Sequence, residues 1–143
     1  MTSTDRRGAI NPHVQFHDEA EFVEVRPGMR RRIVTGEHLS VWLWRIHEST
    51  PQSGLHEHRD SEQFGYIAAG RLEFQIGDGE RVTLGPGDSY VAPKGVVHGG
   101  SIFHGDPDRG GEVWIVDVFA PPRGDDYNAD RGDLNSTNGA AGG

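Results

Sequence analysis

Short apolar segments alternate with glycine- and proline-rich turns through most of this 143-residue chain. Clear examples are the segments 41–46, 72–76 and 113–119, and the second of these runs directly into Gly-Asp-Gly at 77–79. Turn signals every ~8–12 residues between short apolar segments are typical of antiparallel sandwiches and barrels. Helical periodicity is nearly absent. The sequence therefore predicts an all-β fold, in which two antiparallel sheets form a single β-sandwich or barrel.

The composition changes at both ends of the chain. Residues 1–11 are polar, and residues 124–143 contain Leu134 as their one aliphatic side chain larger than alanine. Segments of this kind bury too little apolar surface to offset the entropy lost on ordering. We therefore expect a flexible N-terminal lead at 1–11, one domain at 12–123 and a disordered Gly- and Asp-rich tail at 124–143.

Charge and cysteine content exclude several classes of function. The formal net charge of −8 disfavours binding to nucleic acid or to an anionic membrane surface. The chain has no cysteine, which excludes disulfides, thiolate metal sites and cysteine nucleophiles. No apolar run approaches the ~20 residues of a membrane span, and the polar N-terminus lacks the apolar core of a secretory signal. We therefore expect a cytoplasmic protein that acts on a small molecule.

Histidines in an alternating pattern indicate a metal site. His56 and His58 flank one residue in a strand-like stretch, so both side chains point to one face, ~6–7 Å apart along the backbone. Two imidazoles placed in this way can share one ion. Gln63 lies five residues after His58, and His98 lies in a second Gly- and Pro-rich segment.

These segments resemble the two motifs of the cupin superfamily. The first motif reads His-x-His, three or four residues, Glu or sometimes Gln, six residues, Gly, and the chain matches it from His56 to Gly70. The second reads Gly, five residues, Pro-x-Gly, two residues, His, and the chain matches it from Gly87 to His98. The Asn that ends the second motif is absent, since position 102 is Ile. The resemblance implies the cupin fold, a double-stranded β-helix or jelly roll.

The resemblance also implies the ligands of a divalent ion, which are His56, His58, Gln63 and His98. Glu62 is a reserve ligand, although period-2 alternation turns it to the opposite face from Gln63. Neutral imidazoles and a carboxamide leave the ion its full charge, so it is a strong Lewis acid. We expect Zn²⁺, with Ni²⁺, Fe²⁺ and Mn²⁺ as alternatives. His47 is an alternative fourth ligand or proton carrier.

A second group of candidate residues lies at the end of the last apolar segment. Asp117 shares a strand face with Ile115 and Phe119, and a carboxylate there is costly unless it is paired or used. One interpretation is a structural salt bridge between Asp117 and Arg123. However, the segment also resembles the Asp-x-Phe-x-Pro-x-Arg stretch of cupins from pectin and alginate breakdown, which convert unsaturated uronates to linear keto forms. That resemblance implies that Asp117, Phe119 and Arg123 act at the site.

The aromatic content suggests a different substrate for the same chemistry. The chain is rich in aromatic side chains for a small barrel: Trp42, Trp44, Phe64, Tyr66, Phe103, Trp114 and Phe119. An aromatic cavity suits a flat polyketone, and small cupins also serve as polyketide cyclases in bacterial secondary metabolism, including antibiotic biosynthesis. We therefore place a metal-dependent cyclase first and a uronate isomerase second. In both hypotheses the ion stabilises an enolate, Asp117 moves the proton, and Arg123 holds an oxyanion or carboxylate.

Two further hypotheses stay open at this point. Fe²⁺ at a histidine-rich site would suit a dioxygenase, and a cupin can also bind a small molecule without changing it. Cupins often pair through edge strands, so we expect a homodimer.

Overall fold

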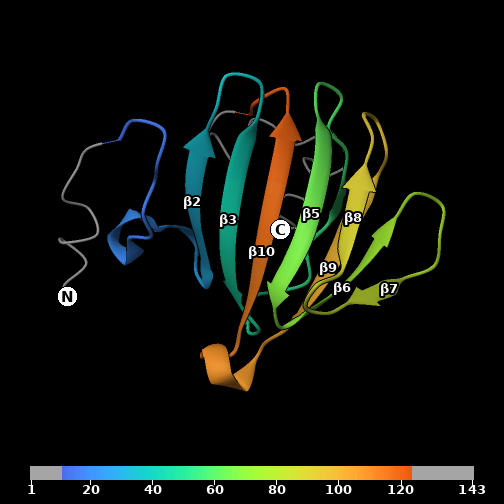
Figure 1. Cartoon of the computed structure of the whole chain (residues 1–143). Coiled ribbons are helices and arrows are strands. Elements are labelled where there is room, and N and C mark those ends of the chain that lie inside the picture. Colours follow the sequence, from blue (N-terminus) through green and yellow to red (C-terminus); the bar gives the residue numbers. More distant parts are fainter. Residues whose placement is uncertain (1–10, 124–143) are drawn as a thin grey trace.

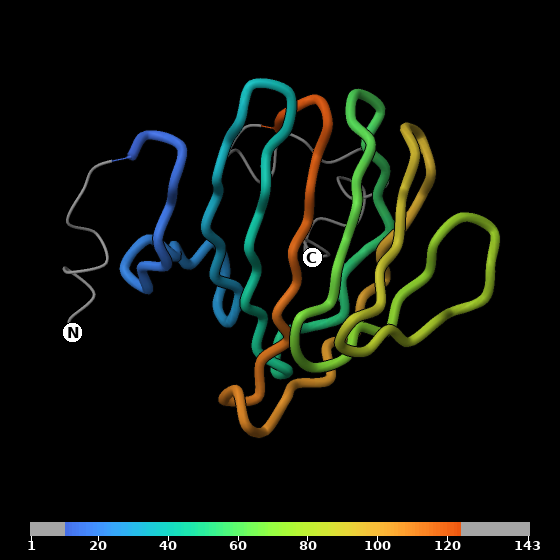
Figure 2. Tube along the Cα trace, in the orientation of Figure 1, coloured from blue at the N-terminus to red at the C-terminus, as the bar shows by residue number. Residues whose placement is uncertain are grey.

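The computed structural model describes residues 11–123, so the predicted tail at 124–143 and all but the last residue of the predicted lead at 1–11 lie outside the described residues. Ten strands and two short 3-10 turns are found in the described part, and the strands form two antiparallel sheets. The sheets lie against each other, as Figures 1 and 2 show. The prediction of an all-β fold built from two antiparallel sheets is confirmed.

The larger sheet has six strands. Their order across the sheet is β1 (Val23–Arg26), β2 (Met29–Thr35), β3 (Ser40–His47), β10 (Glu112–Ala120), β5 (Glu62–Ala69) and β8 (Ser89–Ala92). The smaller sheet has the order β4 (Leu55–His56), β9 (His98–His104), β6 (Arg71–Ile76) and β7 (Val82–Leu84). The 3-10 turns are Glu19–Glu21 before β1 and Pro107–Arg109 between β9 and β10.

Strict alternation along the central strands builds the core. Buried and less buried side chains alternate along β3, β5 and β10, as expected for strands with one face toward a second sheet. The inward side chains of both sheets form one hydrophobic cluster: Met29, Trp42, Trp44, Ile46, Ile67, Leu72, Phe74, Phe103, Val113, Ile115 and Phe119.

The short apolar segments of the sequence do not predict β1, β9 or the first half of β2. In β2 an arginine run hides the alternation: Arg31 points inward over the ring of Trp42, 4.5 Å from its centroid, while Arg30 and Arg32 pair with surface glutamates. In β9 the second residue is Gly99, whose φ is +121°. A Cβ at Gly99 would lie 2.4 Å from the Gly54 carbonyl oxygen. The close approach of Gly54, which directly precedes β4, therefore requires a glycine at a position where an apolar alternation would have a side chain.

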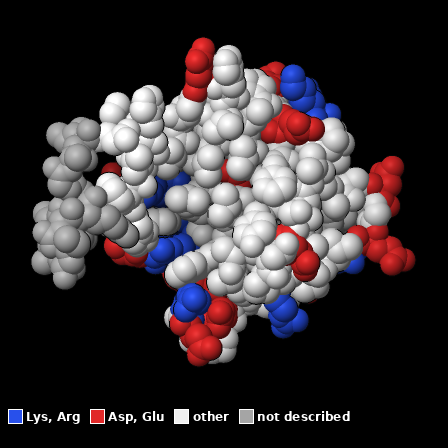
Figure 3. All heavy atoms as spheres, in the orientation of Figure 1, with Lys and Arg blue, Asp and Glu red and all other residues white. Residues whose placement is uncertain are grey.

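Three of the seven aromatic residues that suggested an aromatic cavity face outward. Phe64 and Tyr66 on β5 are 37% and 39% exposed, and the Trp114 ring on β10 lies under the guanidinium of Arg45. Figure 3 views this outward face and shows mostly uncharged side chains over its middle. The expectation that these three aromatics line a cavity is wrong, because the alternation of β5 and β10 turns them away from the core.

Within residues 11–123, the structure has no helix that is long and apolar enough to cross a membrane.

The packing predicts where stability resides. Ile67 is fully buried on β5, so Ile67→Ala leaves a cavity and lowers the free energy of unfolding by ~2–5 kcal/mol. Val91→Ala removes a half-exposed side chain from the neighbouring β8 and costs less than about 1 kcal/mol. Urea denaturation of both variants measures the difference. Equal losses would contradict the assignment of Ile67 to the core.

Candidate metal centre

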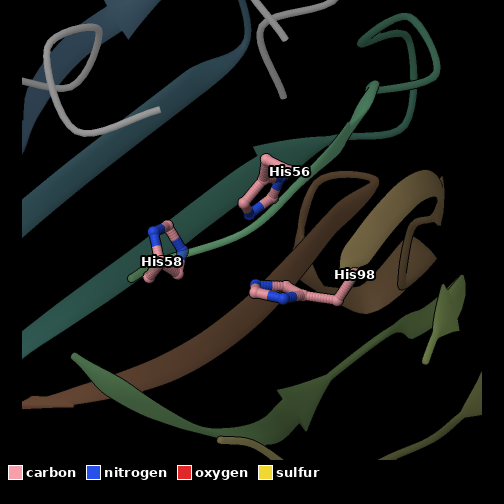
Figure 4. Close-up of side chains that lie close together, drawn as sticks. All are labelled: His56, His58 and His98. Atoms are coloured by element: carbon pink, nitrogen blue, oxygen red, sulfur yellow. The ribbon is translucent and has the colours of Figure 1, made fainter. Parts of the chain in front are cut away.

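Pairing between β4 and β9 brings the histidines of the two motifs together. His56 ends β4, His98 begins β9, and the two residues lie opposite each other in the antiparallel register. His58 follows two residues after His56. One ring nitrogen from each of the three residues lies within 4.8 Å of the other two. Figure 4 shows the three rings gathered around a common point. This three-histidine cluster could bind a divalent metal ion.

Backbone contacts fix the orientation of His98. Its Nδ1 lies 2.9 Å from the Val96 carbonyl oxygen, and a carbonyl only accepts, so Nδ1 carries the proton. The Nε2 lone pair then faces the Gln63 Oε1 at 2.9 Å. Two lone pairs at this distance repel each other unless a proton or a cation lies between them. The donor set of three imidazoles and one amide oxygen therefore fits a divalent ion.

The alternation of β5 separates the two candidate ligands on that strand. Gln63 is 4% exposed and points into the core, whereas Glu62 is on the outward face. The His47 side chain also lies on an outward face, where its Nδ1 is 2.7 Å from the Ser49 hydroxyl. The geometry therefore favours Gln63, and it does not support Glu62 or His47 as a ligand.

Asp117 is buried in the middle of β10 beside the cluster. The Tyr90 hydroxyl lies 3.2 Å from Asp117 Oδ1, and the Gln63 amide nitrogen donates to the Tyr90 oxygen at 2.8 Å. Burial raises the pKa of Asp117 to about 6, although the hydrogen bonds from Gln63 and Tyr90 and the charge of Arg123 oppose the shift. A carboxyl group with a pKa near neutrality can both accept and release a proton.

Two buried serines hold the segment that carries Arg123. The Arg123 backbone N–H donates to the Ser40 hydroxyl at 2.9 Å, and the Ser61 hydroxyl donates to the Pro121 carbonyl at 3.1 Å. The Arg123 guanidinium then reaches the cluster, where its Nη1 lies 2.8 Å from His58 Nδ1. A cation thus lies at the edge of the histidine cluster.

Sequence reasoning missed the residues that support this arrangement. Nothing in the sequence distinguishes Ser40 and Ser61 from other serines near turns. Tyr90 lies inside the second motif, between Gly87 and Pro93. Because Tyr90 is far along the chain from both Gln63 and Asp117, the sequence does not indicate that it contacts them.

One cavity of about 80 Å³ joins these groups. Its polar side is formed by the three histidines, Gln63, Tyr90, Asp117 and Arg123, and its apolar side by core residues that include Trp42, Trp44 and Phe103. The Phe119 ring lies edge-on to His58, with 5.5 Å between the ring centroids. Asp117, Phe119 and Arg123 therefore meet the proposed ligands in one place.

The geometry predicts metal binding that depends on the cluster. Protein purified without chelator should bind about one divalent ion per chain, and His98→Ala should weaken binding by ~100-fold or more because an imidazole ligand is lost. His104→Ala is the control, since that side chain is hydrogen-bonded to Glu73 on the same sheet and lies outside the cavity. Calorimetric titration with Zn²⁺ measures both variants. Equal affinities in the two variants would show that the cluster does not bind the ion.

Comparison with known proteins places the chain in a family. A family model described as a cupin domain matches residues 42–107. The pectin degradation protein KdgF of Dickeya dadantii (strain 3937) is 32% identical over 109 residues, which are 76% of this chain and 92% of that protein.

Solved structures give the same result. KdgF from Halomonas sp. superposes with a TM-score of 0.62 and 30% identity, covering 75% of this chain and 90% of that one. A RmlC-like cupin from Shewanella frigidimarina NCIMB 400 has the same TM-score at 23% identity, covers 80% of this chain and 96% of its own, and supports the fold alone. The prediction from the two motifs is confirmed: the chain belongs to the cupin superfamily.

Proposed function

We propose that this protein is an isomerase that converts a small unsaturated uronate to its linear keto form. The observation that carries the proposal is that a buried carboxyl group, Asp117, and a cation, Arg123, share one small cavity with the three-histidine cluster. Similarity to KdgF, a pectin degradation protein, supports a substrate derived from a uronate polymer.

The reaction is a balanced isomerisation. In a uronate with a double bond between C4 and C5, the ring oxygen is attached to C5. Loss of the proton from the C1 hydroxyl and cleavage of the bond between C1 and the ring oxygen give an aldehyde at C1 and an enol at C5. Protonation of C4 and loss of the enol proton then give a ketone at C5. The reaction needs no oxidant or reductant, only groups that move protons and stabilise negative charge on oxygen.

The residues of the cavity meet these needs. Arg123 binds the substrate carboxylate, in exchange for its contact with His58. Asp117 transfers the proton, since its raised pKa makes both protonation states accessible near neutrality. His56, His58, Gln63 and His98 would hold a divalent ion, Zn²⁺ by preference, which supplies a Lewis acid for the developing charge on oxygen. The Phe119 ring forms the wall beside His58.

The polyketide cyclase, which the sequence analysis places first, has less support. A cavity of about 80 Å³ lies below the ~300–1,000 Å³ of sites for drug-sized ligands and leaves less room for an extended polyketone than for a single uronate ring. Three of the aromatics that suggested this substrate also face outward. The remaining aromatic lining, from Trp42, Trp44 and Phe103, keeps the cyclase as a second candidate.

Two earlier expectations have tests of their own. Metal analysis, together with measurement of oxygen uptake, tests the alternative of an Fe²⁺-dependent dioxygenase. The homodimer stays a prediction, which gel filtration tests.

The proposal predicts a large loss of activity in Asp117→Asn. Proton transfer by a positioned side chain is worth ~10²–10⁴-fold, so kcat should fall by at least ~100-fold while the metal content stays unchanged. NMR spectroscopy follows the conversion of a 4,5-unsaturated galacturonate, with the uncatalysed rate subtracted. Asp78→Asn removes an exposed turn carboxylate and is the control. Full activity in Asp117→Asn, or no acceleration by the natural protein, would overturn the proposal.

The role of Arg123 predicts a change in substrate binding. Lysine keeps the charge but cannot donate two parallel hydrogen bonds to a carboxylate. Arg123→Lys should therefore raise KM for the uronate by ~10-fold and leave KM for its methyl ester nearly unchanged. The two KM values are compared in the same assay. An equal rise for the acid and the ester would show that Arg123 does not hold the carboxylate.

A further inference from the structure

We propose that Tyr90 is a positioning residue, whose hydroxyl fixes the Gln63 amide so that its carbonyl oxygen faces the three-histidine cluster. We further propose that residue 65 is glycine because the Tyr90 ring lies over it. The inference rests on the part of the proposed function that makes Gln63 a metal ligand, and it is independent of the substrate.

A glutamine amide can present either of two groups to a neighbour. Its carbonyl oxygen is a metal ligand, whereas its NH₂ group donates and has no lone pair for an ion. Rotation by 180° about the last side-chain bond exchanges the two groups. Only a partner on the other side of the amide can therefore hold the oxygen toward the cluster.

Tyr90 is one such partner, and Asp117, which also accepts a hydrogen bond from Gln63, supports it. The Gln63 NH₂ group donates to the Tyr90 oxygen at 2.8 Å, which leaves Oε1 2.9 Å from His98 Nε2. The Tyr90 hydroxyl has one proton, and this proton is directed at Asp117 Oδ1 at 3.2 Å. While Asp117 is ionised its carboxylate only accepts, and in that state it sets the direction of both bonds. The chain from Gln63 to Tyr90 to Asp117 thus turns the amide oxygen toward the histidines.

The register of three strands explains how Tyr90 reaches Asp117. Gly65 on β5 lies opposite Asp117 on β10 and opposite Tyr90 on β8. The strands β8 and β10 are ~10 Å apart with β5 between them, so the Tyr90 side chain must cross β5. The Phe74 ring, with its centroid 4.8 Å from that of Tyr90, packs against the tyrosine ring.

Space, and not backbone conformation, requires the glycine at position 65. Gly65 does not have a left-handed φ. A Cβ there would lie 2.1 Å from Cε1 of the Tyr90 ring, which is far inside van der Waals contact. Any side chain at this position displaces the tyrosine and breaks its two hydrogen bonds. The glycine and the tyrosine therefore act as a pair, although they are far apart in the sequence.

Metal-free protein titrated with Co²⁺ tests the proposal without any substrate. Loss of a partner that orients a ligand costs ~10–100-fold in metal affinity, so Tyr90→Phe should weaken Co²⁺ binding to that extent. It should also change the visible absorption of the bound Co²⁺ in the same direction as Gln63→Ala, because the amide oxygen leaves the ion in both variants. Tyr66→Phe removes the same hydroxyl from the outward face of β5 and should match the natural protein.

A second variant separates positioning from folding. Gly65→Ala keeps the Tyr90 hydroxyl but displaces the ring, so it should reproduce the affinity and spectrum of Tyr90→Phe, while circular dichroism confirms that both variants fold. The proposal is overturned if Tyr90→Phe binds Co²⁺ as the natural protein does, or if Gln63→Ala leaves the Co²⁺ spectrum unchanged. Absence of uronate turnover would overturn the proposed function and leave this result unaffected.

Discussion

A line of four polar side chains in contact crosses the largely apolar core, and the site depends on it. The line runs from His98, whose Nε2 faces Gln63 Oε1 at 2.9 Å, through the hydrogen bonds from Gln63 to Tyr90 and from Tyr90 to Asp117. Buried polar groups are costly unless each one is hydrogen-bonded, so every member limits the orientation of the next. The line joins β9, β5, β8 and β10, and it therefore connects both sheets. It also links the proposed metal ligands to Asp117, whose pKa burial raises to about 6.

Much of the fold could be predicted because its causes are local. The apolar segments 41–46 and 113–119 and the alternating segment 72–76 with the turn after it can each be recognised from adjacent residues. The structure has β3, β10 and β6 there. The histidine motif was equally local, since His56 and His58 are separated by one residue. Strands β1 and β9 were missed because arginine, glycine and edge positions do not show the apolar alternation.

The supporting groups of the site could not be predicted, because they depend on register. Tyr90 meets Asp117 only through the pairing of β8 and β10 with β5, and Ser40 meets the backbone of Arg123 only because the last strand, β10, pairs with β3. No spacing in the sequence indicates either contact. The same limit explains the error over Phe64, Tyr66 and Trp114. Their number suggested an aromatic cavity, whereas only the face that each occupies decides whether it reaches the cavity.

The central claim is that Asp117 delivers a proton to one side of a substrate held in the cavity. The most direct measurement is the stereochemistry of the product formed in D₂O, read by NMR at C4 of the linear keto acid at early times. A carboxyl group fixed on β10 can reach only one face of the enol, so the account predicts deuterium at one of the two C4 positions. Deuterium divided equally between both positions would mean that solvent protonates the enol, and it would contradict the account.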